Sequence, residues 1–369
     1  PGINGAMGPA GPAGSSAYDV WLANGNTGTQ QDFLDSLVGP QGPAGTGGGG
    51  GSQTISLNGS TITLSNGGGS VSINDADNDP TNELNTGMTL TNNVLEIQDG
   101  PIPELSDNYV RIRVVAVGIN RADLLQRRGL YSPPAHISAD VLGLEYAGEV
   151  IEVGRAVQKW KVGSRVMGIL PGATYSEQVV AHEREILKIP SAMDYVQAAA
   201  IPEAFLTAFD ALFPQMELGM GERVLIHAIG SGVGNAALQL VKATGAFAIG
   251  TSRTQEKVQR AMDFGLDEGI HVQNGNFLDK LSSPVHKIVD FVGGSYMDQN
   301  LRSLKTQGEM IIVGLLGGRQ SEVNLGLILR NRLRLRGTVL RMRPLEEKIE
   351  LVQNFTKRGL PLFERKKLQ

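Results

Sequence analysis

The sequence predicts an α/β protein in which a doubly wound parallel sheet follows a smaller β-rich domain and a low-complexity N-terminal extension. From about Ala198, short apolar strands alternate with helical stretches, which is the pattern of βαβ units. These strands are expected at Arg223–Ala228, Ala246–Thr251, Lys287–Val292 and Met310–Gly314. Between Tyr109 and Val179 the chain instead has short strand signals around one helix-like segment, NRADLLQRR. With 369 residues, 41% of them hydrophobic, the chain is long enough for several domains.

Charge is distributed unevenly along the chain. Residues 1–100 contain no Lys, Arg or His, so all 33 Lys and Arg side chains follow them. This asymmetry indicates two segments of different role. Neither segment has a Lys/Arg cluster interleaved with aromatic residues, so no nucleic-acid partner is expected.

The chain contains no cysteine, which excludes disulfides, thiol nucleophiles and thiolate metal ligands. Its five histidines show no short metal-ligand spacing, so no metal site is expected. No apolar run reaches the roughly 18 residues of a spanning helix, so no membrane span is predicted. We expect a cytoplasmic location, or the cell surface if the N-terminal segment is a fibre.

Glycine occupies every third position at the start of the chain. The period covers Gly2, Gly5, Gly8, Gly11 and Gly14 and returns at Gly39, Gly42 and Gly45. Three polyproline-type chains leave room only for glycine at their common axis. Residues 1–51 are therefore interpreted as a collagen-like, glycine-rich extension that would form trimers, with a flexible linker as an equal alternative.

Residues 52–100 form a β-rich segment that resembles the repeats of bacterial surface fibres. Apolar and polar residues alternate around Asn58-Gly59 and Asn66-Gly67, which predicts short strands joined by tight turns. Asp75, Asp77 and Asp79 alternate like calcium ligands. A solvated turn is favoured there, because the glycine and the distal glutamate of a calcium loop are missing.

The strongest functional motif is ERVLIHAIGSGVGNAALQLVKATGA, in which a strand leads through a glycine-rich turn to a helix from about Asn235. The turn consists of Gly230, Ser231, Gly232, Val233 and Gly234. Glycines allow the backbone to approach a pyrophosphate at the helix N-terminus, where unpaired N–H groups favour anions. Because strands precede and follow this motif, dinucleotide binding is favoured over an ordinary turn, although the third glycine comes one position early.

The residues after the second strand of this region indicate which dinucleotide is bound. Enzymes that select NAD usually place Asp or Glu there, against the ribose hydroxyls. This chain has Ser252 and Arg253, with Lys257 one turn later. Small polar and cationic groups suit a 2′-phosphate, so NADPH is favoured. A solvated Arg and Lys at a helix start is the alternative.

Several motifs together resemble one family. NRADLLQRRGLY, GLEYAGEV, KVGSRVMGILPG, AAAIPEAFLTAF, LIHAIGSGVG, VDFVGGSY and LLGG occur in the order found in quinone oxidoreductases related to zeta-crystallin. From about residue 101 to 369 the chain thus resembles the zinc-independent branch of the medium-chain dehydrogenase/reductase family. The resemblance implies a GroES-like catalytic domain at 101–200, a Rossmann NADP-binding domain at 201–338, and the start of a return to the catalytic domain at 339–369.

The resemblance also implies departures from the family pattern. The first strand of the catalytic domain lacks a counterpart, LEIQDG resembles its second strand, and relatives continue beyond Gln369, so this domain is expected to be incomplete. Zinc-dependent relatives place Cys and His where Asn120 and Leu144 stand. We therefore expect zinc-independent hydride transfer from NADPH to a quinone or enone. The alternative is a fibre-type structural protein joined to an inactive oxidoreductase remnant.

By resemblance, three residues would line the acceptor pocket: Asn120, Asp123 and Tyr131, with Tyr131 donating a hydrogen bond to the acceptor oxygen. Asn120 and Asp123 equally fit the N-cap and N3 positions of the following helix. The residues expected along the cofactor are Thr207, Gly293, Gly294, Gly314 and Leu315. A homodimer formed through the Rossmann domain is expected as well.

Overall fold

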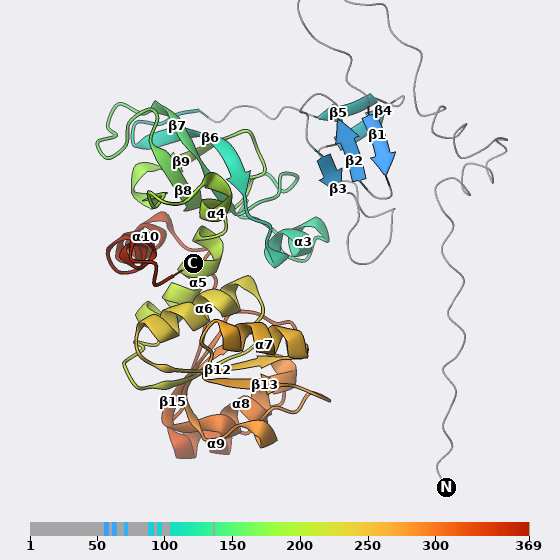
Figure 1. Cartoon of the computed structure of the whole chain (residues 1–369), viewed down its shortest axis with the longest axis vertical. Helices are drawn as coiled ribbons and strands as arrows, with labels where there is room; N and C mark the ends of the chain where they lie inside the picture. The colour runs from blue at the N-terminus through green and yellow to red at the C-terminus, as the bar shows by residue number, and fades with distance from the viewer. Residues whose placement is uncertain are drawn as a thin grey trace, which may run out of the picture. The chain divides into compact units, whose positions relative to one another are not determined.

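The computed structural model describes residues 104–135 and 137–368, together with five short strands before residue 100 (Figure 1). The glycine-period segment and the run Asp75–Asp79 lie outside the described residues. The chain divides into two compact units, Pro1–Asp99 and Gly100–Gln369.

The first unit contains two small antiparallel sheets. One has the order β1 (Ile55–Asn58), β2 (Thr61–Leu64), β3 (Ser70–Ser72), and the other pairs β4 (Met88–Thr91) with β5 (Val94–Ile97). The strand residues of LEIQDG, a stretch that resembles the second strand of the catalytic domain, lie in β5 and pair with β4. Only two residues separate β4 from β5, so a local hairpin closes at low entropic cost.

The second unit begins with a five-stranded antiparallel sheet in the order β10-β8-β7-β6-β9. Its strands are β6 (Tyr109–Val117), β7 (Glu145–Val153), β8 (Arg165–Ile169), β9 (Gln178–His182) and β10 (Ile186–Lys188). Alternating residues such as Val110, Ile112 and Val150 are fully buried in one core. The helix α3 (Arg121–Arg127) follows β6 and leads away from the sheet.

A six-stranded parallel sheet forms the other half of this unit. Its strands are β11 (Arg223–Ile226), β12 (Phe247–Ser252), β13 (Glu268–His271), β14 (Val285–Asp290), β15 (Leu304–Ile312) and β16 (Arg334–Gly337). The order β13-β12-β11-β14-β15-β16, counted from β11 as the first strand, is the 3-2-1-4-5-6 order of a doubly wound dinucleotide-binding fold. The predicted fold class is therefore confirmed.

Helices cover both faces of the parallel sheet (Figure 1). Those on one face are α6 (Gly232–Ala243) and α7 (Gln255–Asp263), and those on the other are α8 (Met297–Ser303) and α9 (Leu325–Asn331). Along β11, Val224 and Ile226 pack in the core on the α6 side, whereas Leu225 packs on the other side with Leu301. Burial on both faces explains why the sequence of this strand is a continuous apolar run.

The remaining helices connect the two sheets. They are α4 (Tyr195–Ala199), α5 (Pro202–Asp210), the π-helical turn Ala211–Gln215, α10 (Leu345–Arg358) and α11 (Leu360–Glu364), and the 3₁₀ turns are Glu183–Glu185, Leu278–Lys280 and Gly294–Tyr296. Asp210, which is 1% exposed, accepts hydrogen bonds of 2.8 and 2.7 Å from Arg343 and one of 2.8 Å from Thr338. This buried ion pair ties the end of α5 to the segment before α10.

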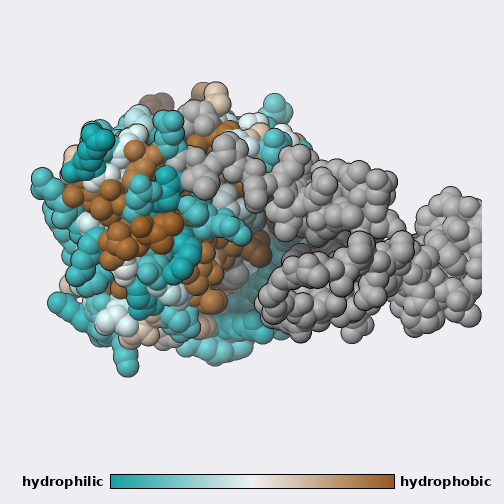
Figure 2. Space-filling model, turned by 90° about the horizontal axis from the view of Figure 1, so that it is seen from above, coloured by the Kyte–Doolittle hydropathy of each residue, from teal (hydrophilic) through white to brown (hydrophobic). Residues whose placement is uncertain are grey.

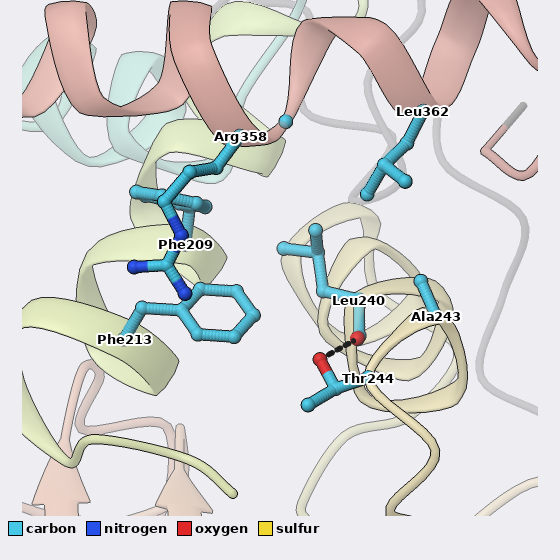
Figure 3. Close-up of a pocket in the computed structure, with 8 residues that line it drawn as sticks. Phe209, Phe213, Leu240, Ala243, Thr244, Arg358 and Leu362 are labelled. Carbon is cyan, nitrogen blue, oxygen red and sulfur yellow. Dashed lines mark hydrogen bonds between the residues drawn. The ribbon is translucent and has the colours of Figure 1, made fainter. Parts of the chain in front are cut away.

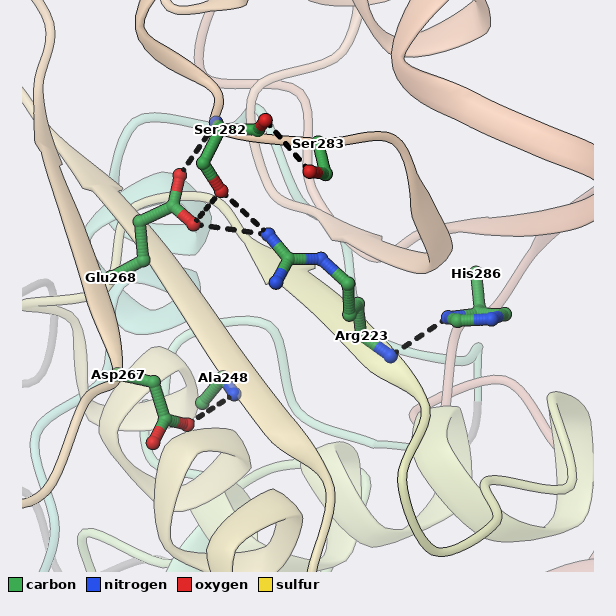
Figure 4. A network of polar contacts seen from close by, with 7 residues as sticks. All are labelled: Arg223, Ala248, Asp267, Glu268, Ser282, Ser283 and His286. Carbon is green, nitrogen blue, oxygen red and sulfur yellow. Dashed lines mark hydrogen bonds and ion pairs between the residues drawn. The ribbon is translucent and has the colours of Figure 1, made fainter.

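A polar network holds the amino ends of the parallel strands (Figure 4). Arg223 donates to Glu268 at 3.0 Å and to the Ser282 hydroxyl at 2.9 Å. The Arg223 backbone N–H donates to His286 Nδ1 at 2.9 Å. This network lies at the opposite edge of the sheet from the glycine-rich turn, so its role is to hold the strands together.

A small hollow of about 130 Å³ lies between α5, α6 and the end of α10 (Figure 3). The residues that line it are Phe209, Phe213, Leu240, Ala243, Thr244, Arg358, Gly359 and Leu362. The Arg358 guanidinium lies 4.9 Å from the centre of the Phe213 ring. None of the residues that are predicted to bind the cofactor or the acceptor lines this hollow.

The face of the molecule seen in Figure 2 is mixed in hydropathy, with groups of apolar atoms among hydrophilic ones. Exposed large apolar side chains of the antiparallel half include Ile119, Val162 and Val115. Exposed apolar side chains are common on folded proteins, so these do not by themselves define a binding surface. No helix in the part of the chain that the structure describes has the length and apolar character needed to cross a membrane.

Candidate active site

The glycine-rich turn joins β11 to α6 at the carboxyl edge of the parallel sheet. The helix begins at Gly232 and not at about Asn235 as predicted, because the Ser231 hydroxyl caps it by accepting from the Gly234 N–H at 3.0 Å. A side chain on Gly234 would lie 2.6 Å from the Ala228 carbonyl oxygen, so this position requires glycine. Gly230, Ser231 and Gly232 are exposed, which leaves the unpaired N–H groups of the first helical turn open to an anion.

The cations expected near a 2′-phosphate lie at the same edge. β12 ends at Ser252, whose hydroxyl accepts from the Thr254 N–H at 3.1 Å. Arg253 and Lys257 are exposed, and neither makes an ion pair with another described residue. A β-carbon on Gly230 would lie 2.7 Å from Lys257 Cδ, so the Lys257 side chain lies directly beside the glycine-rich turn.

The loops after β14 and β15 pack backbone against backbone. The Gly294 N–H donates to the Gly318 carbonyl at 2.9 Å, and the Gly314 N–H donates to the Asp290 carbonyl at 3.2 Å. Gly293 has φ +77, and a side chain there would lie 2.9 Å from the Gly318 carbonyl oxygen. Gly293, Gly294 and Gly314 thus belong to one close-packed edge, next to which Leu315 is 48% exposed.

A buried chain of hydrogen bonds, which the sequence did not reveal, links these loops to β11. His227 is fully buried directly after β11, with Nδ1 at 2.8 Å from the Thr251 hydroxyl and Nε2 at 2.7 Å from Asn300 Oδ1. The Asn300 amide donates to Asp290 Oδ2 at 3.2 Å, so Nε2 is assigned as the donor to Asn300. Asp290 also accepts from the Gly293 N–H at 3.1 Å. Burial lowers the pKa of His227 and favours its neutral form.

The first turn of α3 brings together two of the residues expected in the acceptor pocket. Asp123 Oδ2 accepts from the Asn120 N–H at 2.8 Å, as expected of an N3 residue, and from the Tyr175 hydroxyl at 3.0 Å. The Asn120 amide donates at 2.8 Å to Glu145 Oε1. Asp123 is 2% exposed, and its Oδ1 has no hydrogen-bond partner.

Glu145 is a buried carboxyl that the sequence analysis did not single out. It opens β7, is 3% exposed, and its Oε2 accepts from the Glu203 N–H at 2.7 Å. A side chain on Gly118 would lie 2.0 Å from Glu145 Oε1, so glycine is required beside it. Burial raises the pKa of Glu145 to about 7, against the hydrogen bonds from Glu203 and Asn120. A charged residue within the apolar stretch GLEYAG was the signal that could have revealed it.

Glu203 adds a third carboxyl, and we call Asp123, Glu145 and Glu203 the carboxyl cluster. Glu203 lies in the first turn of α5 and is partly buried. Burial, followed by the charges of Glu145 and Asp123, raises its pKa to about 8, while Arg341 acts in the opposite direction. No described residue makes a hydrogen bond to its carboxyl group.

Arg341 holds Tyr131 against this cluster. Arg341 is 6% exposed and donates to the carbonyls of Pro171 at 2.6 Å and Tyr131 at 3.0 Å, and to the Gln126 side chain. Its guanidinium lies 4.8 Å from the centre of the Tyr131 ring. Burial and then the charge of Glu203 raise the pKa of Tyr131, and Arg341 opposes them. Thr207, the residue expected on the nicotinamide side, is buried one turn after Glu203 on α5.

Comparisons with known proteins match both halves of this unit. The family model described as alcohol dehydrogenase GroES-like domain matches residues 106–191. The family model described as zinc-binding dehydrogenase matches residues 232–357. The chain is 36% identical over 243 residues to a quinone oxidoreductase of Pseudomonas aeruginosa, covering 64% of this chain and 74% of that protein.

Two further relatives are informative. The crystal structure of Escherichia coli quinone oxidoreductase complexed with NADPH superposes with a TM-score of 0.66 at 28% identity, over 75% of this chain and 86% of that one. The polyketide synthase GfsB of Streptomyces halstedii is 35% identical over 221 residues, which are 59% of this chain but only 4% of the synthase. The match to the synthase therefore concerns a small part of a much larger protein.

The doubly wound sheet with its glycine-rich turn, joined to an antiparallel domain, defines the class of two-domain, dinucleotide-binding oxidoreductases. The chain belongs to the medium-chain dehydrogenase/reductase family, with quinone oxidoreductases among its relatives. This confirms the predicted resemblance and its GroES-like and Rossmann folds. The two sheets described above are these two domains.

The matching zinc-binding dehydrogenase model raises the question of whether these residues could hold zinc. Zinc in proteins takes Cys, His, Asp or Glu ligands, usually four in a tetrahedron. The chain has no cysteine, and no group of three such residues suited to a metal occurs among the described residues. By the resemblance, Asn120 and Leu144 would stand at the family's zinc positions, and both Glu145 oxygens already accept N–H groups. The donor set does not fit zinc.

Proposed function

We propose that this oxidoreductase reduces quinones or conjugated enones with NADPH and works without zinc. The observation that supports it most is the chemistry of the expected acceptor side, where Asn120, Asp123 and Tyr131 supply an amide, a carboxyl and a phenol, and no group suited to a metal occurs among the described residues. The relatives named quinone oxidoreductases support the same acceptor class. The pairing of protomers through the Rossmann domain, the trimeric N-terminus and the boundaries of the five segments stay predictions.

The proposed hydride transfer depends on how the protein positions the cofactor and the acceptor. A reduced nicotinamide, when bound, supplies the hydride. The glycine edge around Gly293 and Gly314 and the face of Thr207 would hold the cofactor, while Tyr131 would donate a hydrogen bond to the acceptor oxygen. Quinones and enones suit such a site, because their reduced oxygen is a stabilised anion that needs no Lewis acid.

The cofactor preference can be tested by fluorescence titration with NADPH and NADH, followed by quinone-dependent oxidation of each. We expect NADPH to bind more tightly, since Arg253 and Lys257 are exposed cations without an ion pair among the described residues, and Lys257 lies beside the turn. Arg253→Ala should weaken NADPH binding by about 1.5–3 kcal/mol and leave NADH binding unchanged. Arg260→Ala, an exposed cation at the other end of α7, is the matched control. Equal affinities of the unmodified protein for the two nucleotides would contradict the preference.

Metal independence has a separate test. Exhaustive chelation should leave quinone reduction unchanged, because the described residues around Asn120 include no zinc ligand set. Elemental analysis of the purified protein should find zinc well below one equivalent. A stoichiometric zinc ion, lost together with activity, would show this part of the proposal to be wrong.

A further inference from the structure

Glu203 lies between the expected cofactor side and the expected acceptor side of the site. It precedes Thr207 by four residues on α5, so both occupy the same face of this helix. Its backbone N–H donates to Glu145 at 2.7 Å, and the other oxygen of Glu145 holds the Asn120 amide at 2.8 Å. Glu203 thus joins Thr207 to the pocket residue Asn120.

The carboxyl of Glu203 is poorly compensated for a partly buried group. No described residue donates a hydrogen bond to it, and its nearest charged neighbours include two further carboxyls, Glu145 and Asp123. Arg341 is the nearby cation, but it donates to the carbonyls of Pro171 and Tyr131. A carboxylate that is partly removed from water beside two other carboxyls is costly, whereas the protonated acid avoids part of that cost and offers a donor of its own.

We propose that Glu203 is the acid that protonates the reduced acceptor, an inference that rests on the proposed quinone or enone reduction. The hydride brings an electron pair into the conjugated acceptor, whose oxygen becomes negative. The O–H bond of Glu203 breaks, a new O–H bond forms on that oxygen, and the carboxylate regains its proton from water. The sum is acceptor, NADPH and one proton giving the reduced acceptor and NADP⁺.

The electrostatic surroundings favour this role at neutral pH. The titratable and charged groups facing Glu203 are Asp123 on α3, Tyr131 after α3, Glu145 on β7 and Arg341 before α10. Burial and the two carboxyls raise the pKa of Glu203 to about 8, so the acid is protonated at pH 7. A general acid works best when its pKa lies near the working pH.

The experiment uses the full chain with NADPH and 1,4-benzoquinone. The unmodified protein is measured first, and failure to bind NADPH or to reduce the quinone would count against the proposed function itself. With that activity in hand, Glu203→Gln should lower kcat by about 10²- to 10⁴-fold while NADPH affinity stays within about two-fold. In the unmodified protein kcat should decline above pH 8 as Glu203 loses its proton. This decline should disappear in Glu203→Gln. Glu177→Gln, an exposed glutamate of the same domain, should change neither.

Two outcomes would overturn the assignment while leaving the proposed function intact. One is a Glu203→Gln protein that keeps its kcat, and the other is an alkaline decline that persists in it. If Glu203→Gln does not fold, Glu203→Asp decides. The shorter acid should retain the alkaline decline with kcat at least about ten-fold lower, and an unchanged kcat would overturn the role.

Discussion

Two buried polar networks in the second unit are built in opposite ways. In the Rossmann domain, His227, Thr251, Asn300 and Asp290 form a chain in which each side chain has a hydrogen-bond partner. In the carboxyl cluster, by contrast, Asp123 Oδ1 and the Glu203 carboxyl lack partners among the described residues. Both networks lie beside the candidate active site.

The network around His227 supports the site, whereas the carboxyl cluster contains Glu203, the proposed acid. A fully satisfied network is rigid, and this one fixes the loop that begins at Gly293 relative to the strand that precedes the glycine-rich turn. In the carboxyl cluster, burial and then the neighbouring carboxyl charges raise the pKa values of Glu145 and Glu203 to about 7 and about 8. Burial alone therefore does not identify the functional group; what distinguishes the cluster is that three carboxyls lie together in it.

The largest expected effect is a difference in stability loss between two isosteric substitutions, one in each network. Asp290 accepts from the Asn300 amide and from backbone N–H groups with both oxygens, so Asp290→Asn would point a donor at donors and cost about 2–4 kcal/mol of stability. Asp123 uses only Oδ2, so Asp123→Asn can turn its amide toward the unpartnered side and should cost less than about 1 kcal/mol. Urea unfolding of both variants measures the contrast. Equal losses would show that the two networks do not differ as described.

A smaller effect is an opposite dependence of stability on pH. Glu145 has a folded pKa of about 7 against 4.5 when unfolded, so its contribution is complete below pH 4.5 and is lost as pH rises through 7. The pKa of His227 is lowered from 6.5, so its contribution is present above pH 6.5 and is lost as pH falls. The Glu145 effect should amount to about 3 kcal/mol.

Two variants separate these contributions. Glu145→Gln should reduce the alkaline decline of the unfolding free energy and leave the part that Glu203 contributes, and His227→Gln should flatten the acid decline. Denaturant unfolding at pH 5, 6.5 and 8.5 gives both slopes. If Glu145→Gln changes the acid side, the assignment of the two declines is incorrect.

The sequence predicted the features that depend on neighbours along the chain. The glycine-rich turn, the strands around it and the N3 position of Asp123 are local patterns, and the structure has them within a few residues of the expected places. The helix start at Gly232 was missed because Ser231 was assigned to the turn and not considered as a cap. Local sequence determines such elements through propensity and capping.

The residues that were missed depend on distant contacts. Arg341 follows Tyr131 by 210 positions and yet holds its carbonyl. Glu203 and Glu145 come together only because α5 begins against β7. No periodicity in the sequence predicts this contact. In the sequence, His227 is a single polar residue at the end of an apolar strand. Only the structure shows that Asn300 and Thr251 are its hydrogen-bond partners. Tertiary packing, and not local pattern, supplies this part of the site.

The smallest effect is expected from removing residues 1–99. Both networks are made of residues that follow Gly100, and the chain divides into its two compact units at that point. A chain that begins at Gly100 should therefore keep the NADPH affinity of the full protein within about two-fold and the same alkaline and acid declines of stability. The number of chains per particle in solution should change only if the glycine-period segment assembles into trimers. Fluorescence titration, unfolding at several pH values and light scattering of both chains measure these quantities. Loss of NADPH binding on truncation would mean that residues before Gly100 belong to the enzyme fold, and the comparison of the two networks would then have to include them.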